Sequence, residues 1–243
     1  MCAASVAIVG AGIAGLACAK ELQTAGLSVQ VFEKSRGLGG RSATRFASLS
    51  KFDHGAQFFT ARSKNFLDWV DAGLQMGLIA SWQPRLRYER EAPQWYVGVP
   101  GMSSLARVFQ LDELVQREAL VLQIERIETP GQMPWRLTYE KNQQLQVATF
   151  DFVILAIPGP QAAQLLQKSI ANQPTLDGAL TALYKNYPAK QCCHAGPFGL
   201  RQIVIYWGTL NTMCGRYLRI WKITRFVGLL KITPSRFEKT SLV

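Results

Sequence analysis

The sequence predicts an α/β protein whose central parallel sheet is wound with helices on both faces. Three observations predict this fold class. An apolar run at residues 6–9 is followed directly by three glycines and a helical pattern. A second apolar run, residues 29–32, ends at an acidic residue, and a third, residues 152–156, again precedes a helical pattern. Buried parallel strands read as continuous apolar runs, and crossover helices join them.

The first strand leads into a turn of three glycines, Gly10, Gly12 and Gly15, in a G-x-G-x-x-G arrangement. Gly10 permits the tight turn, Gly12 lets a pyrophosphate approach the backbone, and Gly15 lets the next helix lie close to the strand. That helix, predicted for residues 13–25, points its free N–H groups and positive dipole end at the phosphates. The strand, the spacing and the helix together predict a dinucleotide-binding turn.

Glu33 ends the second apolar run, 18 positions after Gly15. An acidic side chain at this distance can accept hydrogen bonds from a ribose hydroxyl, and its charge disfavours a 2′-phosphate there. Residues 34–41, KSRGLGGR, then add a second glycine-rich turn with cations that can lie along a pyrophosphate.

Three blocks of the sequence carry a resemblance to a known family. Residues 33–41 resemble the E-x(5)-G-G-R pattern of the FAD-containing amine oxidase superfamily. Residues 52–62, FDHGAQFFTAR, and residues 96–103, YVGVPGMS, are similar to blocks of renalase and its bacterial relatives within that superfamily. The resemblance covers about residues 5–182.

The resemblance implies a Rossmann-type FAD-binding domain of the glutathione-reductase-like, amine oxidase type, with an inserted, incomplete substrate domain. We expect residues 1–182 to form this domain, with partial substrate-domain strands inserted at about residues 63–100. FAD is the implied cofactor. The residues implied to bind it, by motif position, are Gly10, Ala11, Gly12, Ile13, Ala14, Gly15, Glu33, Lys34, Gly39, Gly40, Arg41, Gly55, Ala56, Gln57, Phe58 and Val121.

Residues 52–62 are predicted to form a short strand and turn that bring Gly55 and Ala56 to the cofactor, where little side-chain bulk suits a flat ring system. His54 either donates a hydrogen bond to the flavin or satisfies a buried carbonyl, and the second role is favoured. Asp53 and Arg62 either pair with each other or leave Arg62 facing an anionic substrate.

The middle of the chain alternates between helical and strand patterns. Residues 63–78 approach helical spacing, and residues 82–99 contain two strand-like runs that the resemblance assigns to the substrate domain. Pro100-Gly101 ends the second run, and Ser103 or Ser104 can cap a helix running to about Phe109. Residues 115–127 alternate as a meander strand, in which the resemblance places a backbone contact of Val121 with the adenine side of FAD.

The last recognisable elements are a hairpin and a second β–α unit. Residues 135–139 and 145–150 are predicted to pair across the polar turn at residues 140–144. The buried strand at residues 152–156 is followed by Pro158 and a helix from Gln161 through Leu166, which resembles a V-V-L-A-[IV]-P-x-P-Q block of the family. Ligands of such sheets bind at the carboxyl ends of the strands.

Composition and length fit a globular protein with one or two domains, since 48% of the 243 residues are hydrophobic and 18% are charged. No window of eighteen apolar residues predicts a transmembrane helix, and the apolar start reads as the first strand because it lacks a positive n-region. The five cysteines show no C-x-x-C pair and no zinc spacing, so no metal is expected and a reducing cytoplasm is the simplest compartment.

The net charge of +11 is concentrated in the last quarter of the chain. Residues 1–182 hold 17 Lys and Arg against 15 Asp and Glu, whereas residues 183–243 hold 10 against 1. Three interpretations of this tail stay open: a basic partner-binding module, a divergent core with Ile203, Val204 and Ile205 in a strand, and a shifted reading frame, which is favoured. We therefore expect no nucleic-acid and no membrane partner.

By resemblance to renalases, the substrate is a dihydronicotinamide, an isomer of NAD(P)H reduced at the wrong ring carbon, or in a broader variant an amine. Its hydride would pass to FAD, and O2 would reoxidise the flavin to give hydrogen peroxide. No catalytic base can be assigned from the sequence. The alternative is a non-catalytic dinucleotide-binding remnant that lacks the C-terminal flavin-capping motif.

Overall fold

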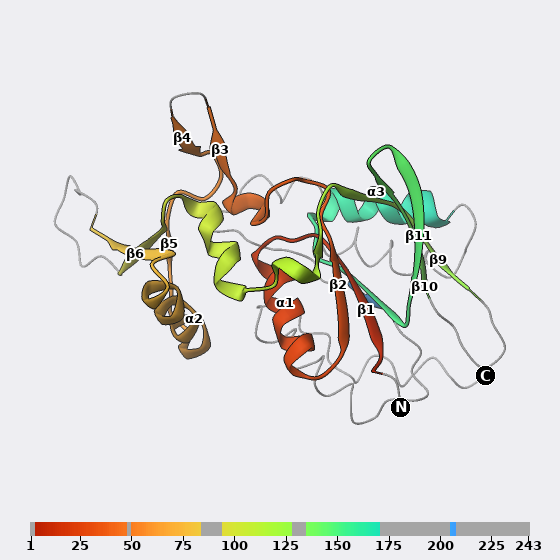
Figure 1. Ribbon diagram of the computed structural model, residues 1–243, viewed down its shortest axis with the longest axis horizontal. Coiled ribbons are helices and arrows are strands. Elements are labelled where there is room, and N and C mark those ends of the chain that lie inside the picture. The colour runs from red at the N-terminus through yellow and green to blue at the C-terminus, as the bar shows by residue number, and fades with distance from the viewer. Residues whose placement is uncertain (1–2, 48–49, 84–93, 128–134, 171–204, 208–243) are drawn as a thin grey trace, which may run out of the picture.

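The computed structural model describes residues 3–47, 50–83, 94–127, 135–170 and 205–207 (Figure 1). Its largest sheet has the strand order β13-β12-β1-β2-β8. The strands are β1 (Ser5–Val9), β2 (Ser28–Phe32), β8 (Val115–Gln116), β12 (Phe152–Leu155) and β13 (Ile205–Trp207). The first four run parallel, and β13 runs antiparallel to β12. The predicted parallel sheet is confirmed.

The central strand β1 is buried on both faces because its side chains enter two different cores. Val6 and Ile8 pack with helix α1 (Ile13–Thr24) on one face of the sheet. Ala7 and Val9 pack with an antiparallel meander and helix α3 (Gly159–Ile170) on the other. Since successive strand side chains point to opposite faces, a continuous apolar run serves both cores. The doubly wound α/β class predicted from the sequence is therefore correct.

The meander consists of β9 (Ala119–Arg126), β10 (Trp135–Lys141) and β11 (Gln144–Phe150). The predicted five-residue turn was wrong, because β10 and β11 pair up to Lys141 and Gln144 and leave a two-residue turn. Asn142 and Gln143 both have positive φ, 52° and 61°, which is the conformation of a type I′ hairpin turn. Residues 115–127 also divide into β8 and β9, separated at Glu118, whose φ is 54°.

A second, three-stranded antiparallel sheet has the order β5-β7-β6. Its strands are β5 (Phe59–Thr60), β6 (Ile79–Trp82) and β7 (Trp95–Gly98), and it packs with helix α2 (Lys64–Gln75) and the 3-10 helix η2 (Met102–Phe109) in a third apolar core. The predicted helix over residues 63–78 and the second strand-like run are thereby confirmed. The first run, around Arg85 to Arg90, lies outside the described residues.

Three short elements join the two sheets. They are the 3-10 helix η1 (Gly40–Ser42) and the hairpin of β3 (Thr44–Phe46) and β4 (Lys51–Asp53), which projects at the upper left of the ribbon (Figure 1). The 3-10 helix η3 (Asp112–Leu114) precedes β8. The helix η2 contacts η1, α1, α2 and β7, so it lies at the junction of the two parts.

Two sequence predictions about the ends of elements are corrected by the structure. Ser103 and Ser104 do not cap η2, because that helix begins at Met102 and its N-cap is Gly101, with no side-chain cap of its own. The second is the strand proposed for Ile203, Val204 and Ile205 in the tail. The described strand there is β13, which begins at Ile205, and Ile203 and Val204 lie outside the described residues. Among the helices that the structure describes, none combines the length and hydropathy needed to cross a bilayer.

Candidate dinucleotide site

The first glycine turn joins β1 to α1 at the carboxyl edge of the parallel sheet. Gly10 has φ 105°, and its N–H donates to the Phe32 carbonyl at 2.8 Å. A Cβ on Gly10 would lie 2.7 Å from the Ala156 carbonyl oxygen, and one on Gly15 would overlap the Gly10 carbonyl. Both positions therefore need glycine, one for its backbone angle and both for close packing.

The N-terminus of α1 leaves this turn without a side-chain cap. Gly12 is the N-cap residue, it makes no side-chain hydrogen bond, and no acidic residue occupies the first helical turn. Ala14 and Gly15 are buried there, with Ile13 partly so. Unsatisfied backbone N–H groups and the positive end of the helix dipole favour an anion at such a terminus.

The second glycine turn lies directly against the first. The Gly39 N–H donates to the Ala11 carbonyl at 2.9 Å, and Gly12 and Gly39 form an isolated parallel bridge. Gly39 and Gly40 have φ of 102° and 57°, and a Cβ on Gly40 would lie 3.2 Å from the Gly12 Cα. The two turns, which are separate in sequence, thus form one small-residue surface.

Glu33 lies at this surface and is only 7% exposed. Its Oε2 accepts a hydrogen bond from the Ala11 N–H at 2.8 Å, and its Oε1 accepts one from the Ser35 N–H at 2.9 Å. The side chain therefore points back toward the glycine turn. Each carboxylate oxygen keeps further lone-pair capacity that a hydroxyl donor can use.

The segment after β4 reaches the second turn from the other side. The Ala56 N–H donates to the Arg41 carbonyl at 3.0 Å, and a Cβ on Gly55 would overlap the same carbonyl. Gln57 next to it is exposed. Phe58 turns away into the second sheet, where its ring stacks on Trp95 at 4.0 Å between centroids.

The remaining predicted residues lie at the periphery of this surface. The Lys34 ammonium donates to the Gln161 side chain at 3.4 Å, so it spans from the end of β2 to the start of α3. Val121 is buried in β9, which begins where the Ala119 N–H donates to the Glu33 carbonyl. The structure thus brings the two turns, Glu33 and Gly55 together, and it places Phe58 apart from them.

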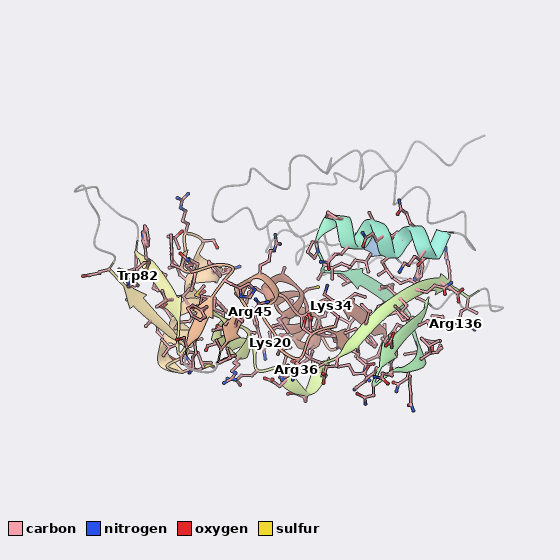
Figure 2. The ribbon with its side chains drawn as sticks, turned by 90° about the horizontal axis from the view of Figure 1, so that it is seen from above. Lys20, Lys34, Arg36, Arg45, Trp82 and Arg136 are labelled. Atoms are coloured by element: carbon pink, nitrogen blue, oxygen red, sulfur yellow. The ribbon has the colours of Figure 1, made fainter. Side chains whose placement is uncertain are left out.

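Cations border the site. Lys34, Arg36, Arg41 and Arg45 are all exposed, and Figure 2 shows Lys34, Arg36 and Arg45 over the middle of the molecule, between Trp82 and Arg136 at its two ends. The one acidic residue at the turn, Glu33, has its oxygens directed to backbone amides. The surroundings therefore favour an anionic ligand.

The structure bears on the alternatives for Asp53 and His54. Among the described residues no ion pair joins Asp53 to Arg62, and Asp53 Oδ1 instead accepts hydrogen bonds from the Thr44 hydroxyl at 2.6 Å and the Met102 N–H at 2.9 Å. His54 is exposed, which argues against its favoured role of satisfying a buried carbonyl, and its contact with a flavin stays a prediction. Arg62 is likewise exposed.

Sequence inspection missed two residues of the site, Ser35 and Thr44. Ser35 contributes its backbone N–H to Glu33, and a backbone donor leaves no signal in residue type. Thr44 contributes its hydroxyl to Asp53. Thr44 and Asp53 lie opposite each other in the β3–β4 hairpin, so a prediction of that hairpin over residues 44–53 would have brought them together.

The uncapped start of α1 suits an anionic group, and the described residues around it include no acid–base pair. Within the part of the chain that the structure describes, burial raises the pKa of the Cys18 thiol to about 12, and the charge of Glu21 has a smaller effect in the same direction. Cys18 lies inside α1, in the core. Within the described ranges, His, Cys, Asp and Glu side chains form no group of three that could hold a metal ion.

Comparisons with known proteins agree with this geometry. The family described as NAD(P)-binding Rossmann-like domain matches residues 8–72, which contain both glycine turns. A triple mutant and a double mutant of putrescine oxidase are similar in structure, with TM-scores of 0.52 and 0.54 at 15% and 16% identity. A putative protoporphyrinogen oxidase from Exiguobacterium sp. 255-15 has a TM-score of 0.51 at 16% identity.

The matches cover 67%, 68% and 73% of this chain but only 59%, 60% and 64% of the three solved structures. At this identity the likeness shows the fold alone. The chain is thus a Rossmann-like α/β protein that shares its arrangement with part of these oxidases.

Proposed function

We propose that this chain binds FAD and belongs to a flavin-dependent oxidoreductase of the renalase-like type. The observation that carries the proposal is the contact of the two glycine turns, Gly39 against Ala11 and Gly12, at the uncapped start of α1. A single turn suits any dinucleotide. The second turn with its Gly-Gly-Arg sequence supports a flavin dinucleotide, by the resemblance described above.

The residues present fit FAD at its diphosphate and its adenosine sugar. The backbone N–H groups at the start of α1 and the side chain of Arg41 would hold the diphosphate. Glu33 would accept hydrogen bonds from ribose hydroxyls, and its charge argues against a 2′-phosphate. The backbone of Val121 and the Gly55–Gln57 segment would border the two ends of the cofactor.

FAD, when bound, supplies a hydride acceptor that O2 can reoxidise with release of hydrogen peroxide. The proposed role of this chain's own residues is to bind the cofactor and to orient it. The proposed substrate is a dihydronicotinamide isomer of NAD(P)H or an amine, and the amine alternative is supported by the putrescine oxidase solved with putrescine bound. The proposed compartment is the cytoplasm.

The direct test is the flavin content of the purified chain. We expect a yellow protein with near-stoichiometric FAD, whose absorbance is bleached without oxygen by a dihydronicotinamide isomer and recovers in air with peroxide formed. A putrescine-type amine is the parallel substrate. A chain that neither retains nor takes up FAD would refute the proposal.

A matched pair of arginine variants tests the diphosphate contact. Arg41→Gln removes a cation beside the glycine turns, so FAD should dissociate about tenfold more readily. Arg136→Gln removes an exposed cation of β10, at one end of the molecule (Figure 2), and should leave the dissociation constant unchanged. Equal effects of the two variants would mean that only general electrostatics acts on the ligand.

The second candidate is a dinucleotide-binding protein without turnover. The observation in its favour is that the described residues of the site supply binding groups, namely the backbone amides at the start of α1 and the Glu33 carboxylate, and no acid–base pair. It predicts FAD binding by the same residues, with no bleaching by either substrate class and no peroxide. The reduction experiment separates the two candidates even when binding is equal.

A further inference from the structure

A hydrogen-bonded pair at the base of the β3–β4 hairpin joins the dinucleotide site to the second sheet. Asp53 Oδ1 accepts from the Thr44 hydroxyl at 2.6 Å and from the Met102 N–H at 2.9 Å. Thr44 Oγ1 in turn accepts from the Ser103 N–H at 3.0 Å. The first two amides of η2 are thus satisfied by side chains about fifty residues earlier in the chain.

This remote cap replaces the local one that η2 lacks. Gly101, the N-cap residue, makes no side-chain hydrogen bond, and a Cβ there would lie 2.7 Å from Thr44 Oγ1. Glycine at that position therefore makes room for the incoming hydroxyl. Free helix amides that are out of solvent need an acceptor, and here it comes from the hairpin.

Both members of the pair are tied closely to the second glycine turn. Thr44 follows η1 by two positions, and Thr44 and Asp53 are paired opposite each other in the hairpin. Two residues after Asp53, the Gly55–Ala56 strip rests on Arg41, the middle residue of η1. The chain on either side of the hairpin therefore returns to the same turn.

The helix that receives the pair is itself held by both parts of the molecule. It contacts α1 and η1 on the nucleotide side and α2 and β7 on the other. Within this junction, the Gly98 N–H of β7 donates to Met102 Sδ at 3.1 Å. A shift of the pair would therefore move the second glycine turn relative to both sheets.

We propose that Asp53 and Thr44 are positioning residues that hold the second glycine turn and the Gly55–Ala56 strip against the first turn. They act through η1 and η2 and do not contact the ligand. The proposal concerns the cofactor geometry of the proposed FAD site and rests on it to that extent. The joint itself, meaning the hydrogen bonds of Asp53 and Thr44 with each other and with the Met102 and Ser103 amides, is present in the cofactor-free chain and can be tested separately.

The substitutions at Asp53 and Thr44 either keep or remove the side-chain oxygen that accepts the hydrogen bonds. Asp53→Asn keeps a carbonyl oxygen that can accept both bonds now made by Oδ1, whereas Asp53→Ala removes the acceptor. Thr44→Ser keeps the hydroxyl and Thr44→Val removes it at nearly constant size. Asp68→Ala, an exposed acid of α2, is the control for lost charge.

The first measurement is amide hydrogen exchange in the cofactor-free chain. We expect Asp53→Ala and Thr44→Val to speed exchange at Met102 and Ser103, and at Ala56, by about tenfold or more. Asp53→Asn, Thr44→Ser and Asp68→Ala should match the wild type. The proposal would be overturned by unchanged exchange rates in both Asp53→Ala and Thr44→Val, or by amides that exchange as fast in Asp53→Asn as in Asp53→Ala.

The second measurement is the FAD dissociation constant with the absorbance spectrum of the bound flavin. The disruptive variants should bind about tenfold more weakly with a shifted spectrum, and the conservative ones should restore both. Normal binding by Asp53→Ala would overturn the positioning role. If the wild type binds no FAD, the proposed function fails, and the exchange measurement still decides whether the joint exists.

Discussion

At the scale of single residues, Glu33 is a buried carboxylate that forms no ion pair with any described residue. The ion pairs found among the described residues, Arg117–Asp112 and Arg136–Glu125, lie elsewhere. Two backbone amides, of Ala11 and Ser35, supply the hydrogen bonds that the buried group requires. Glu33 therefore shapes the glycine turn as well as offering an acceptor to a ligand.

Glu33→Gln should destabilise the cofactor-free chain by about 1–3 kcal/mol, because the amide group of glutamine would face one of the two backbone N–H donors. The measurement is the free energy of unfolding in urea without ligand. Glu113→Gln, at an exposed position of η3, serves as the control. Equal stability of the Glu33 variant and the wild type would limit Glu33 to a role in ligand binding.

Cys18 illustrates the opposite case of a reactive group that the fold makes inert. Burial, with a smaller effect from Glu21, raises the pKa of its thiol from 9.0 to about 12. The thiolate is the reactive form, so iodoacetamide at about pH 8 should leave Cys18 unmodified in the folded chain and modify it in concentrated urea. Peptide mass spectrometry reads the result, and rapid labelling of the folded chain would contradict the burial.

The same pKa shift fixes a pH dependence. Because the folded thiol holds its proton more tightly than the unfolded one, its contribution to stability is complete below about pH 9 and is lost as the pH rises toward about 12. Cys18→Ala should flatten the fall in stability across that range.

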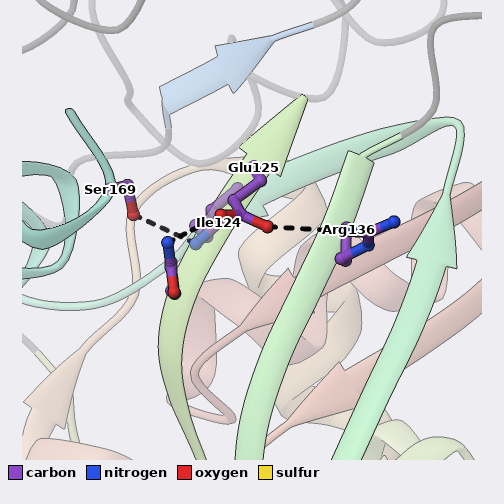
Figure 3. A network of polar contacts seen from close by, with 5 residues as sticks. Ile124, Glu125, Arg136 and Ser169 are labelled. Carbon is purple, nitrogen blue, oxygen red and sulfur yellow. Dashed lines mark hydrogen bonds and ion pairs between the residues drawn. The ribbon is translucent and has the colours of Figure 1, made fainter. Parts of the chain in front are cut away.

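At the scale of secondary structure, β9 is an edge strand of the meander and needs acceptors for its outward amides. Ser169 of α3 is fully buried, accepts from the Ile124 N–H at 3.0 Å and donates to the Leu165 carbonyl at 2.8 Å. Figure 3 shows this contact beside the ion pair of Glu125 and Arg136, which joins β9 to its neighbour β10. The hydroxyl therefore locks the helix onto the strand.

Ser169→Ala should cost about 1–3 kcal/mol, because it leaves the buried Ile124 N–H without an acceptor. The free energy of unfolding of the variant is compared with that of Ser81→Ala, whose hydroxyl lies on an exposed position of β6. A cost below that of the exposed control would show that water or a rearranged α3 replaces the bond.

A helix, strand or turn could be predicted from the sequence wherever a pattern of neighbouring residues is enough to specify it. The apolar runs at β1, β2 and β12 and the glycines after β1 are such cases. The hairpin turn was misjudged because the polar residues on either side of it look like a loop, although they continue the strands. Asn142-Gln143 lacks the glycine that marks a type I′ turn, so only the backbone angles reveal it.

The sequence predicted that the two glycine turns and Glu33 lie together, but not all of their contacts. The glycines and Glu33 follow fixed spacings around one strand and helix, and they do lie together. The alternatives for Asp53 could not be resolved, because its partner amide at Met102 is 49 residues away and belongs to the backbone. A hydrogen bond between a side chain and a distant backbone amide leaves no pattern in the sequence from which it could be predicted.

At the scale of the whole molecule, ligand binding should be visible as stability. FAD at one hundred times its dissociation constant should raise the free energy of unfolding by about 2.7 kcal/mol. ADP-ribose should give a smaller increase, and its 2′-phosphorylated form none, because Glu33 opposes a phosphate at that position. Thermal unfolding with each compound checks this order, and a larger shift with the 2′-phosphate would contradict the assignment of Glu33.

The pairing of β1 with both β2 and β12 has a consequence for biosynthesis. β1 and β2 are synthesised early, whereas β12 is complete only after residue 155 has been added and leaves the exit tunnel later still. Until then one edge of β1 stays open in the nascent polypeptide, and Gly10 lacks the Ala156 carbonyl that closes its turn. The glycine turn that the proposed dinucleotide would contact is therefore complete only after most of the described chain has been made.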